Sequence, residues 1–330
     1  VEIARGCGRG CQFCEPNLRV LRSFPLEKII RDVKVNLAAG RQPLLHAEDV
    51  LRYGATGPVP KKEKVIRLFK AGRSIEGVER IGISHFALSS VASSPELIEE
   101  LTPLMKGVNS KWVSGQTGIE TASPKLMSKY MLGKAKPFKP EEWRDVVVKA
   151  FEILKANDWV PCATLIIGLP GEDERDVEQT IELVEELKGF KSLIVPLFFV
   201  SMGVLRKLGY KSMELRDLNR ARSMLLLKAW KHNLRWAPTL IREYFSMTSK
   251  SKALACGASL ILALGIRYAM KLIEICEEEY DFDILRLRKE ILEGKTTLPT
   301  LILKSRIKRL KAKMKRLAVP RVVSRLSSKV

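Results

Sequence analysis

Three cysteines close to the N-terminus, Cys7, Cys11 and Cys14, constrain this chain more than any other feature. They follow the spacing C-x3-C-x2-C, and glycines stand at positions 6, 8 and 10 of the same segment. Iron–sulfur clusters are held by cysteine thiolates, usually four of them. A short loop with three thiolates therefore predicts a four-iron cluster in which one iron stays open to a substrate or cofactor. Glycines suit a loop that wraps closely around such a cluster.

Two other interpretations of these cysteines fit less well. A zinc site needs a fourth nitrogen or sulfur ligand, and no Cys or His occurs between residues 15 and 44. A disulfide framework is not expected in a long chain whose six cysteines are unevenly spaced. The other three, Cys162, Cys256 and Cys276, occur singly, and for the last two an apolar helical setting predicts inert buried thiols.

The first two hundred residues alternate short apolar runs with amphipathic stretches, which predicts βα units and a parallel sheet. We expect strands at residues 1–5, 43–48, 81–88, 112–119, 162–167 and 193–200, and helices at 26–39, 62–71, 95–105, 141–157 and 173–188. Six strand–helix steps predict an α/β chain that forms a partial (β/α)6 TIM-like barrel. In such barrels the chemistry takes place at the C-terminal ends of the strands.

Beyond residue 210 the strand patterns fade and a helical C-terminal appendage is expected. Residues 214–236 and 240–276 have helical patterns, and Pro238 is expected to break the chain between them. The predicted organisation is a core domain at 1–210, a helical appendage at 211–300 and a basic tail at 301–330. The uncharged run 253–266 is too short to span a membrane, so it is either a buried core helix or an interfacial element that dips into lipid.

The charge of the chain is strongly basic, with 58 Lys and Arg against 37 Asp and Glu and a net charge of +21. Residues 301–330 contain eleven Lys and Arg and no acidic residue. Such a tail predicts binding to a polyanion, either RNA or an anionic membrane surface. Unpaired cysteines indicate a reducing compartment, so we expect a cytoplasmic protein, peripheral at the membrane if lipid is the partner. The sequence opens on Val1 rather than Met, and we expect further residues upstream.

The cysteine spacing, with Phe13 directly before the third cysteine, resembles the radical S-adenosylmethionine (SAM) superfamily over residues 1 to about 200. The resemblance implies a [4Fe–4S] cluster on the three cysteines and SAM at the open iron. At the end of the second strand, His46, Glu48 and Asp49 stand where the family has a Gly-Gly-Glu-like stretch that holds the SAM amino group. The resemblance leaves open whether Glu48 or Asp49 makes that contact, and an acid at the start of a helix is the alternative role.

Two further segments resemble the family in the expected order. Gln116 to Ser123 is similar to a Gly-Ile-Glu-Ser stretch, which implies that Gln116 and Glu120 contact the ribose or the amino acid end of SAM. Glu120 could instead cap the next helix, which begins at Ser123-Pro124. Residues 164–172 resemble the fifth-strand segment that lies along the adenine, with Gly168 allowing close approach. Phe13 is expected to pack near the adenine as well.

The resemblance implies an enzyme that accepts one electron, from a reductant such as ferredoxin or flavodoxin, and cleaves SAM to methionine and a 5′-deoxyadenosyl radical. The radical would abstract hydrogen from an unactivated C–H bond, leading to C–H functionalisation, methyl or methylthio transfer, or C–C bond formation. The core resembles the branch of methylthiotransferases and cobalamin-dependent enzymes, so cobalamin held by an upstream domain is a further expectation.

The substrate is expected to be a lipid or another hydrophobic molecule, because an apolar run precedes the basic tail. An RNA-modifying, methylthiotransferase-like enzyme is the alternative, although the helical appendage differs from the small β-barrel of those enzymes. A non-catalytic iron–sulfur protein that binds nucleic acid is the alternative of another class.

Overall fold

The computed structural model describes residues 1–15, 20–248 and 252–318. Its contacts form two compact units, Val1–Ile266 and Arg267–Val330, and each is described by itself. The expected domain boundaries at residues 210 and 300 follow changes in sequence pattern rather than contacts, and they stay predictions.

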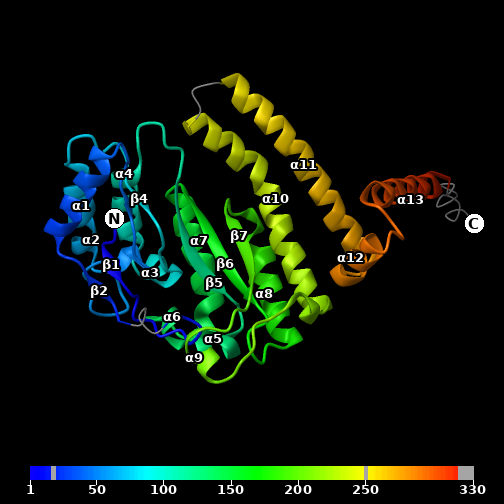
Figure 1. Ribbon diagram of the computed structural model, residues 1–330, viewed down its shortest axis with the longest axis horizontal. Coiled ribbons are helices and arrows are strands. Elements are labelled where there is room, and N and C mark those ends of the chain that lie inside the picture. The colour runs from blue at the N-terminus through cyan, green and yellow to red at the C-terminus, as the bar shows by residue number, and fades with distance from the viewer. Residues whose placement is uncertain (16–19, 249–251, 319–330) are drawn as a thin grey trace, which may run out of the picture. The chain divides into compact units, whose positions relative to one another are not determined.

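The first unit is built on parallel strands that lie side by side in chain order (Figure 1). Within the described residues these are β1 (Ala4–Arg5), β3 (Leu44–Leu45), β4 (Gly82–Ile83), β5 (Val113–Glu120), β6 (Trp159–Ile167) and β7 (Leu193–Phe198). Continuous ladders join β3 to β4 and β5 to β6 to β7. Parallel bridges, Glu2 to His46 and His85 to Gln116, complete the series.

This order confirms the partial (β/α)6 barrel. No pairing of β7 with β1 occurs among the described residues, so the sheet stays open rather than closed. A short antiparallel strand, β2 (Arg22–Ser23), pairs with β1. Four expected strands are shorter than predicted: that at 1–5 is confined to β1, that at 43–48 to β3 and that at 81–88 to β4, and β7 ends at Phe198 rather than at residue 200. After β4 the chain makes a single bridge at His85 and enters a helix at Leu88.

The helices follow the strands and cover the buried face of the sheet (Figure 1). They are α1 (Leu26–Ala38), α2 (Lys62–Arg73), α3 (Leu88–Ser93), α4 (Pro95–Met105), α5 (Pro124–Tyr130), α6 (Leu132–Ala135), α7 (Trp143–Ala156), α8 (Glu174–Glu186) and α9 (Gly203–Lys207). Two buried tryptophans fix the packing. The indole N–H of Trp143 donates to the carbonyl of Ile119 at 3.1 Å, and that of Trp159 donates to Thr102 at 2.8 Å.

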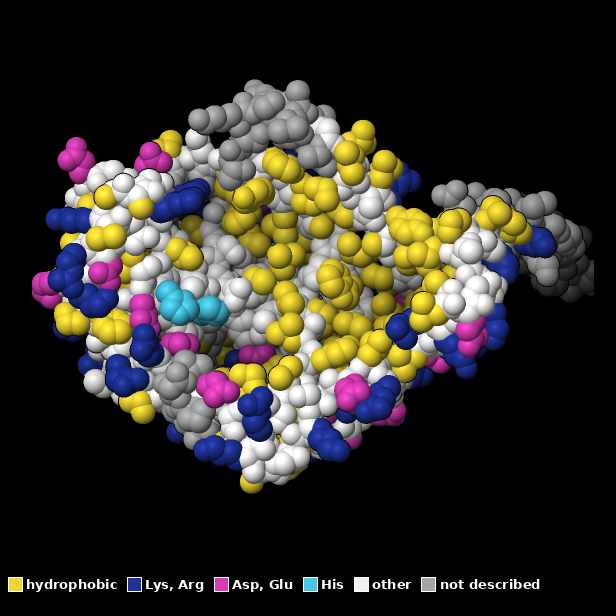
Figure 2. Space-filling view, viewed as in Figure 1, with side chains coloured by type: hydrophobic (Ala, Val, Ile, Leu, Met, Phe, Trp, Pro, Cys, Tyr) yellow, Lys and Arg dark blue, Asp and Glu magenta, His cyan; other side chains and the backbone are white. Residues whose placement is uncertain are grey.

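The sheet has one buried face and one open face, as the alternation along β6 shows. Ala163, Leu165 and Ile167 are fully buried in the core, whereas Cys162, Thr164 and Ile166, which alternate with them, are half-buried. We call the second side the open face. Figure 2 shows it as a hollowed surface, with hydrophobic side chains gathered over β6, β7 and α10 and histidines on the opposite side. The strands therefore form a wall whose inner side is available to a ligand.

The long helix α10 (Arg220–Thr248) corrects the prediction at Pro238. The helix continues through this proline instead of ending there. Proline in a helix interior removes one hydrogen bond and costs about 3 kcal/mol. Packing of α10 against α8 and β7 offsets this cost, because it buries Leu225, Ala229 and Leu240.

Polar contacts also dock α10 on β7, the edge strand of the sheet. The side-chain amide of Asn233 accepts from the backbone N–H of Ile194 and donates to its carbonyl, both at 2.7 Å. Next to it, His232 is buried and contacts the hydroxyl of Ser192 at 2.9 Å. His232 is therefore a packing residue, as its place in an amphipathic helix predicts. The amide of Asn233 replaces the strand neighbour that Ile194 lacks.

The uncharged run 253–266 lies in α11 (Lys252–Glu279). Leu260, Ile261 and Leu264 are 65%, 72% and 58% exposed, so the buried-core interpretation is wrong at these positions. Side chains 252–256, including Cys256, lie outside the described residues. None of the described helices combines the length and the apolar character that crossing a membrane requires.

The second unit contains the end of α11 together with α12 (Ile284–Leu292) and α13 (Leu298–Ala318). Arg309 of α13 forms ion pairs with Glu274 at 3.0 Å and Glu278 at 2.7 Å. The first part of the predicted basic tail is therefore helical, and residues 319–330 lie outside the described residues.

Candidate active site

The cysteine loop follows β1 at the C-terminal end of the strand, and hydrogen bonds from distant segments hold it. The backbone N–H of Gln12 donates to the carbonyl of Tyr130 at 2.9 Å, and the Gln12 carbonyl accepts from Val204 N–H at 3.0 Å. The guanidinium of Arg52 donates to the carbonyl of Cys7. Segments after β3, β5 and β7 thus fix one short loop.

Glycines make this close packing possible. The loop glycines at positions 6, 8 and 10 have φ of 77°, 69° and 70°, which agrees with the expected tight wrapping. A Cβ at Gly133 would overlap the carbonyl oxygen of Arg9, and one at Gly203 would overlap that of Cys14. The loop is therefore packed directly against the backbones of α6 and α9.

The thiols of this loop have the chemistry that an iron–sulfur cluster needs. Cys7, Cys11 and Cys14 are free and lie within one loop. A hydrogen bond with Cys14 lowers the pKa of Cys11 to about 7, and it raises the pKa of Cys14. Burial raises the pKa of Cys7. Nearby Lys134 favours thiolates at both Cys11 and Cys14, and thiolates are the form that binds metal.

No three His, Cys, Asp or Glu side chains in the described part of the chain converge on one metal ion. A four-iron cluster does not require convergence, because each cysteine binds a different iron. The donor set and the fixed backbone therefore fit a cluster with three protein ligands. Binding would separate Cys11 from Cys14, which now share a hydrogen bond.

Arg9, within the same loop, is buried among polar partners. Its Nη1 donates to the backbone carbonyls of Gly133, Lys134 and Lys136, at 3.3, 3.2 and 3.0 Å. Its Nη2 donates to Asp49 Oδ2 at 3.0 Å and to Ser90 at 2.9 Å. The side chains of Arg9 and Asp49 are only 6% and 1% exposed. This pair joins the cysteine loop to the end of the second barrel strand.

The neighbouring acids Glu48 and Asp49 differ in their surroundings. Besides Arg9, Asp49 accepts from the hydroxyl of Ser90 at 2.8 Å and from the N–H of Ala87 at 3.2 Å. In Glu48, by contrast, the buried Oε2 has no hydrogen-bond partner among the described residues. A buried carboxylate oxygen without a partner is costly. Glu48 is thus the acid of this pair that is available to a cationic ligand.

Glu120 lies at the end of β5 in an unusual backbone conformation. Its φ is 64°, rare for a residue other than glycine, and the strand register shifts between Gly118 and Glu120. The carboxylate accepts from Lys134 Nζ at 2.9 Å and from Thr164 Oγ1 at 3.0 Å. Burial lowers the pKa of Lys134, but the charges of Glu120 and Cys11 outweigh it, so the net pKa is raised. Lys134 therefore stays protonated between the carboxylate and the thiols.

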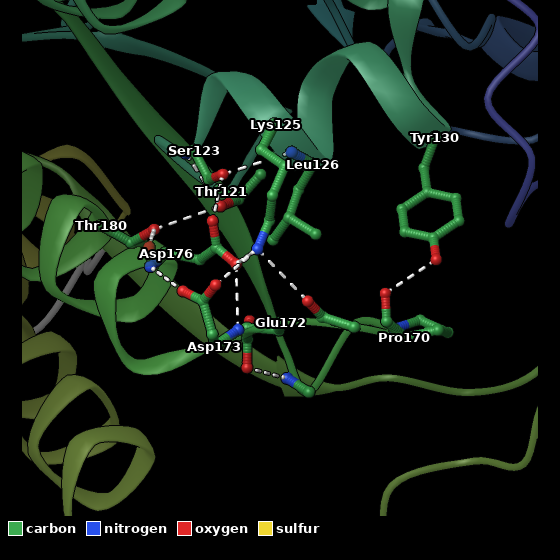
Figure 3. A network of polar contacts seen from close by, with 12 residues as sticks. Thr121, Ser123, Lys125, Leu126, Tyr130, Pro170, Glu172, Asp173, Asp176 and Thr180 are labelled. Carbon is green, nitrogen blue, oxygen red and sulfur yellow. Dashed lines mark hydrogen bonds and ion pairs between the residues drawn. The ribbon is translucent and has the colours of Figure 1, made fainter.

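The helix after Glu120 is capped by another residue. Ser123 is the N-cap of α5 and accepts from Leu126 N–H at 3.2 Å, with Pro124 in the first turn. The same hydroxyl donates to Asp176 at 2.6 Å, and Thr121 contacts Thr180 at 3.2 Å (Figure 3). The start of α8 thereby fixes the turn after β5. Glu120 therefore does not cap this helix. The contacts of Thr121 and Ser123 with α8 hold the turn that directly follows Glu120.

Gly168 directly follows β6, has a φ of 83° and donates its N–H to Glu172 at 2.9 Å. Burial raises the pKa of Glu172, although the hydrogen bond from Arg222 opposes that effect. A Cβ at Gly168 would collide with the side chain of Met213. The segment that is expected to lie along the adenine therefore contains Gly168 with the side chain of Met213 directly against it. The thioether of Met213 can contact a flat ring. Phe13 is partly buried and packs against the core.

On the open face, His46 and His85 form an edge-to-face pair with ring centroids 5.8 Å apart. His85 forms a parallel bridge with Gln116, and its buried Nδ1 has no partner among the described residues. Desolvation and the nearby His46 lower the pKa of His85. His46, His85 and Gln116 form a polar strip across β3, β4 and β5.

Sequence reasoning missed three residues of the site: Arg9, Lys134 and Met213. Arg9 stands between two loop glycines, which was a usable sign of a buried cation. Lys134 follows Glu120 by fourteen residues and Met213 follows Gly168 by forty-five, distances at which no periodicity connects them. The predicted residues Cys7, Cys11, Cys14, Glu48 and Glu120 all lie at the C-terminal ends of strands or directly after them.

Comparison with known proteins agrees with this geometry. The sequence model of the radical SAM superfamily matches residues 1–184. Ribosomal protein uS12 methylthiotransferase RimO of Thermotoga petrophila is 30% identical over 191 residues, which are 57% of this chain and 41% of that protein. The tRNA-2-methylthio-N(6)-dimethylallyladenosine synthase of Thermosipho africanus is 27% identical over 193 residues, again 57% and 41%.

Among solved structures, the radical S-adenosylmethionine methyltransferase TsrM from Kitasatospora setae, with cobalamin and a [4Fe–4S] cluster bound, has 12% identity and a TM-score of 0.46. The match covers 59% of this chain and 36% of TsrM. The chain spans about two fifths of the length of the curated relatives it matches.

Because the superfamily model covers more than half of the sequence, this chain belongs to the radical SAM superfamily. Its cofactors are accordingly a [4Fe–4S] cluster and SAM, and the three-cysteine loop is the place in this chain that can hold the cluster.

Proposed function

We propose that this chain cleaves SAM reductively and directs the resulting radical at a C–H bond of a hydrophobic substrate such as a lipid. The observation that carries the substrate class is the open face, where apolar side chains of β6 and β7 are accessible. Leu197 of β7 is 46% exposed and Val200, just beyond the strand, is 56% exposed. Large apolar surfaces left open in a protein commonly mark binding sites.

The residues of the site have separate roles in this proposal. Cys7, Cys11 and Cys14 hold the cluster, and the cluster and SAM together supply the 5′-deoxyadenosyl radical. Glu48 accepts the SAM ammonium through a charge-assisted hydrogen bond. Asp49 holds the cysteine loop through Arg9 and does not contact SAM.

The end of β5 would receive the rest of the cofactor. Glu120 and Lys134 form a buried ion pair, and both charges can bind polar groups of SAM without large rearrangement. The turn at Gly168 and the side chain of Met213 contact the adenine. Since these groups are held before SAM arrives, little ordering would accompany binding.

An RNA substrate is the second candidate. Its support is the basic charge of the chain, +21 overall, and the names of the curated relatives, one of which is a tRNA-modifying synthase. The exposed apolar residues of α11, such as Ile261, favour lipid over RNA. A non-catalytic role has less support, because a structural cluster would not need the unpaired carboxylate of Glu48. The electron donor, ferredoxin or flavodoxin, and cobalamin stay predictions.

A binding experiment separates lipid from RNA. The reconstituted protein is incubated with vesicles of neutral lipid, with vesicles that contain anionic lipid, and with RNA, at low and high salt. Apolar insertion predicts vesicle binding that survives high salt, whereas purely electrostatic binding is lost as salt rises. Binding to RNA alone would contradict the lipid proposal.

Replacing Glu48 by glutamine is expected to weaken SAM binding about 10- to 150-fold with little change in stability. The reason is the loss of one charge-assisted hydrogen bond, which contributes about 1.5–3 kcal/mol. Isothermal titration with SAM under anaerobic conditions measures the effect. Glu76→Gln, at an exposed position, is the matched control and should bind as the parent does. An unchanged affinity in Glu48→Gln would contradict the assignment.

A further inference from the structure

We propose that a pocket between the N-terminal ends of β5, β6 and β7 and the helices α10 and α11 binds the hydrocarbon chain of an amphiphilic substrate. The inference rests on the proposed function and deepens it by naming the substrate class. The pocket has a volume of about 290 Å³. Apolar and aromatic side chains line it: Trp112, Val160, Leu193, Leu240, Tyr244 and Leu262.

The chemistry of the wall selects against polar ligands. Its two small polar side chains are Ser114 and Cys162. The Ser114 hydroxyl already donates to the carbonyl of Val160 at 2.8 Å, and burial raises the pKa of Cys162, so this thiol stays neutral. A pocket of this size, mostly apolar, lies at the small end of the range for ligand sites. The buried indole N–H of Trp112 is a single donor without a partner among the described residues. An alkyl chain fits the pocket, because its wall carries no charge and this one donor cannot satisfy a strongly polar group.

The pocket opens outward rather than being a closed packing defect. Tyr244 and Leu262, which line it, are 53% and 43% exposed. The next residue, Ile261, is 72% exposed, so the rim continues into the apolar surface of α11. A chain could therefore enter from a hydrophobic phase without crossing a polar barrier.

The position of the pocket determines how long the substrate must be. Cys162 lies in the pocket wall, and Gly168 at the end of β6 lies beside the proposed SAM site. They are six residue steps apart along the chain, a distance of roughly 20 Å in extended strand. Ile166 and Leu197 of the open face lie between these points and are accessible. A molecule that fills the pocket and also reaches the reacting end must be elongated.

The other side of the open face supplies the polar half of an amphiphile's site. Gln116 of β5 is in register with Cys162 of β6, so the polar strip meets the apolar wall directly. Beyond Gln116 the strip continues through His85 to His46. One molecule could thus place its chain in the pocket and a polar group against the imidazoles. A uniformly polar substrate, such as RNA, would leave the apolar half unused.

The test uses the full-length reconstituted protein and a fluorescent alkyl probe, 11-(dansylamino)undecanoic acid. Titration should show saturable binding with a blue-shifted emission. Displacement by primary alcohols should strengthen about fourfold for each added methylene until the pocket is filled. Leu193→Asn places a polar group in the wall at nearly constant size and should weaken probe binding about tenfold or more.

A second variant, Leu193→Trp, fills the pocket with a larger side chain and should also exclude the probe. Far-UV circular dichroism of both Leu193 variants shows whether a loss of probe binding reflects misfolding. Ile261→Asn makes the same kind of change on the exposed rim and should retain probe affinity within about twofold. Equal loss in Ile261→Asn and Leu193→Asn would show adsorption to the surface of α11 and overturn the pocket. Binding unaffected by both Leu193 variants would overturn it as well.

Failure of this inference can be told apart from failure of the proposed function. In parallel, 5′-deoxyadenosine formation by the unaltered protein is measured without substrate. Formation of 5′-deoxyadenosine together with no saturable probe binding would overturn the pocket alone. Saturable probe binding together with no SAM cleavage would support the pocket and overturn the proposed reaction.

Discussion

Replacing Cys11 by alanine is expected to remove the iron–sulfur cluster and all formation of 5′-deoxyadenosine. The remaining Cys7 and Cys14 can bind only two irons, and no other cysteine of the described chain lies in the loop. Clusters of this type depend on their thiolate ligands. Anaerobic iron and sulfide analysis should fall from about four irons per chain to below about one. Dithionite reduction with SAM should then yield no 5′-deoxyadenosine.

The matched control is Cys276→Ala. Cys276 is also buried, and it lies in α11, a helix distant in sequence from the cysteine loop. Its replacement should retain iron and SAM cleavage. A Cys11→Ala protein that kept its full iron content, or that contained zinc instead, would contradict the cluster assignment and the reaction with it.

Replacing Asp49 by alanine is expected to lower the free energy of unfolding by about 3–5 kcal/mol. The guanidinium of Arg9 would be left buried without its ionic partner, and breaking a buried pair has a cost of this size. Urea unfolding of the cluster-free protein, followed by tryptophan fluorescence, measures it. The signal reports on the core because Trp143 and Trp159 are buried there.

Glu48→Ala is the informative comparison for Asp49→Ala. Glu48 is the sequence neighbour but has a carboxylate oxygen without a partner, so its removal should leave stability almost unchanged. A double variant, Arg9→Met with Asp49→Leu, removes both charges and should recover part of the loss. Equal destabilisation by Glu48→Ala and Asp49→Ala would contradict the division of roles between these two acids.

Much of the barrel follows from local patterns in the sequence. Helix α4 begins at Pro95 and ends at Met105 as predicted, because proline in the first turn and a regular apolar period act locally. Pro238 was the clear error. Its local preference for a break is outweighed by packing of α10 against α8 and β7, and a sequence read in short windows contains no sign of that packing.

The residues of the candidate site likewise fall into two groups, those that a local sequence pattern reveals and those that only long-range contacts bring into place. The cysteine spacing is local, so the loop could be found from the sequence. The partners of Glu120 and of the loop are long-range: Lys134 and Arg9 acquire their positions only when the strands are assembled. Whether Glu48 or Asp49 is available to the SAM amino group depends on the side of the backbone to which each carboxylate points. Asp49 is bound by Arg9 and Ser90, which lie 40 residues before it and 41 residues after it in the chain.

The contact between Asn233 and Ile194 has a consequence for the size of molecule that this protein can admit. Exposed edge strands tend to pair with another strand, and here a side-chain amide already occupies the hydrogen-bonding groups of β7 at Ile194. The barrel is therefore prevented from closing at that point by a helix that is part of its own fold. The width of the open side is then limited by α10 rather than by the number of strands. A scaffold of this kind can receive an elongated molecule along its open side, where a closed barrel would accept only what passes through its end.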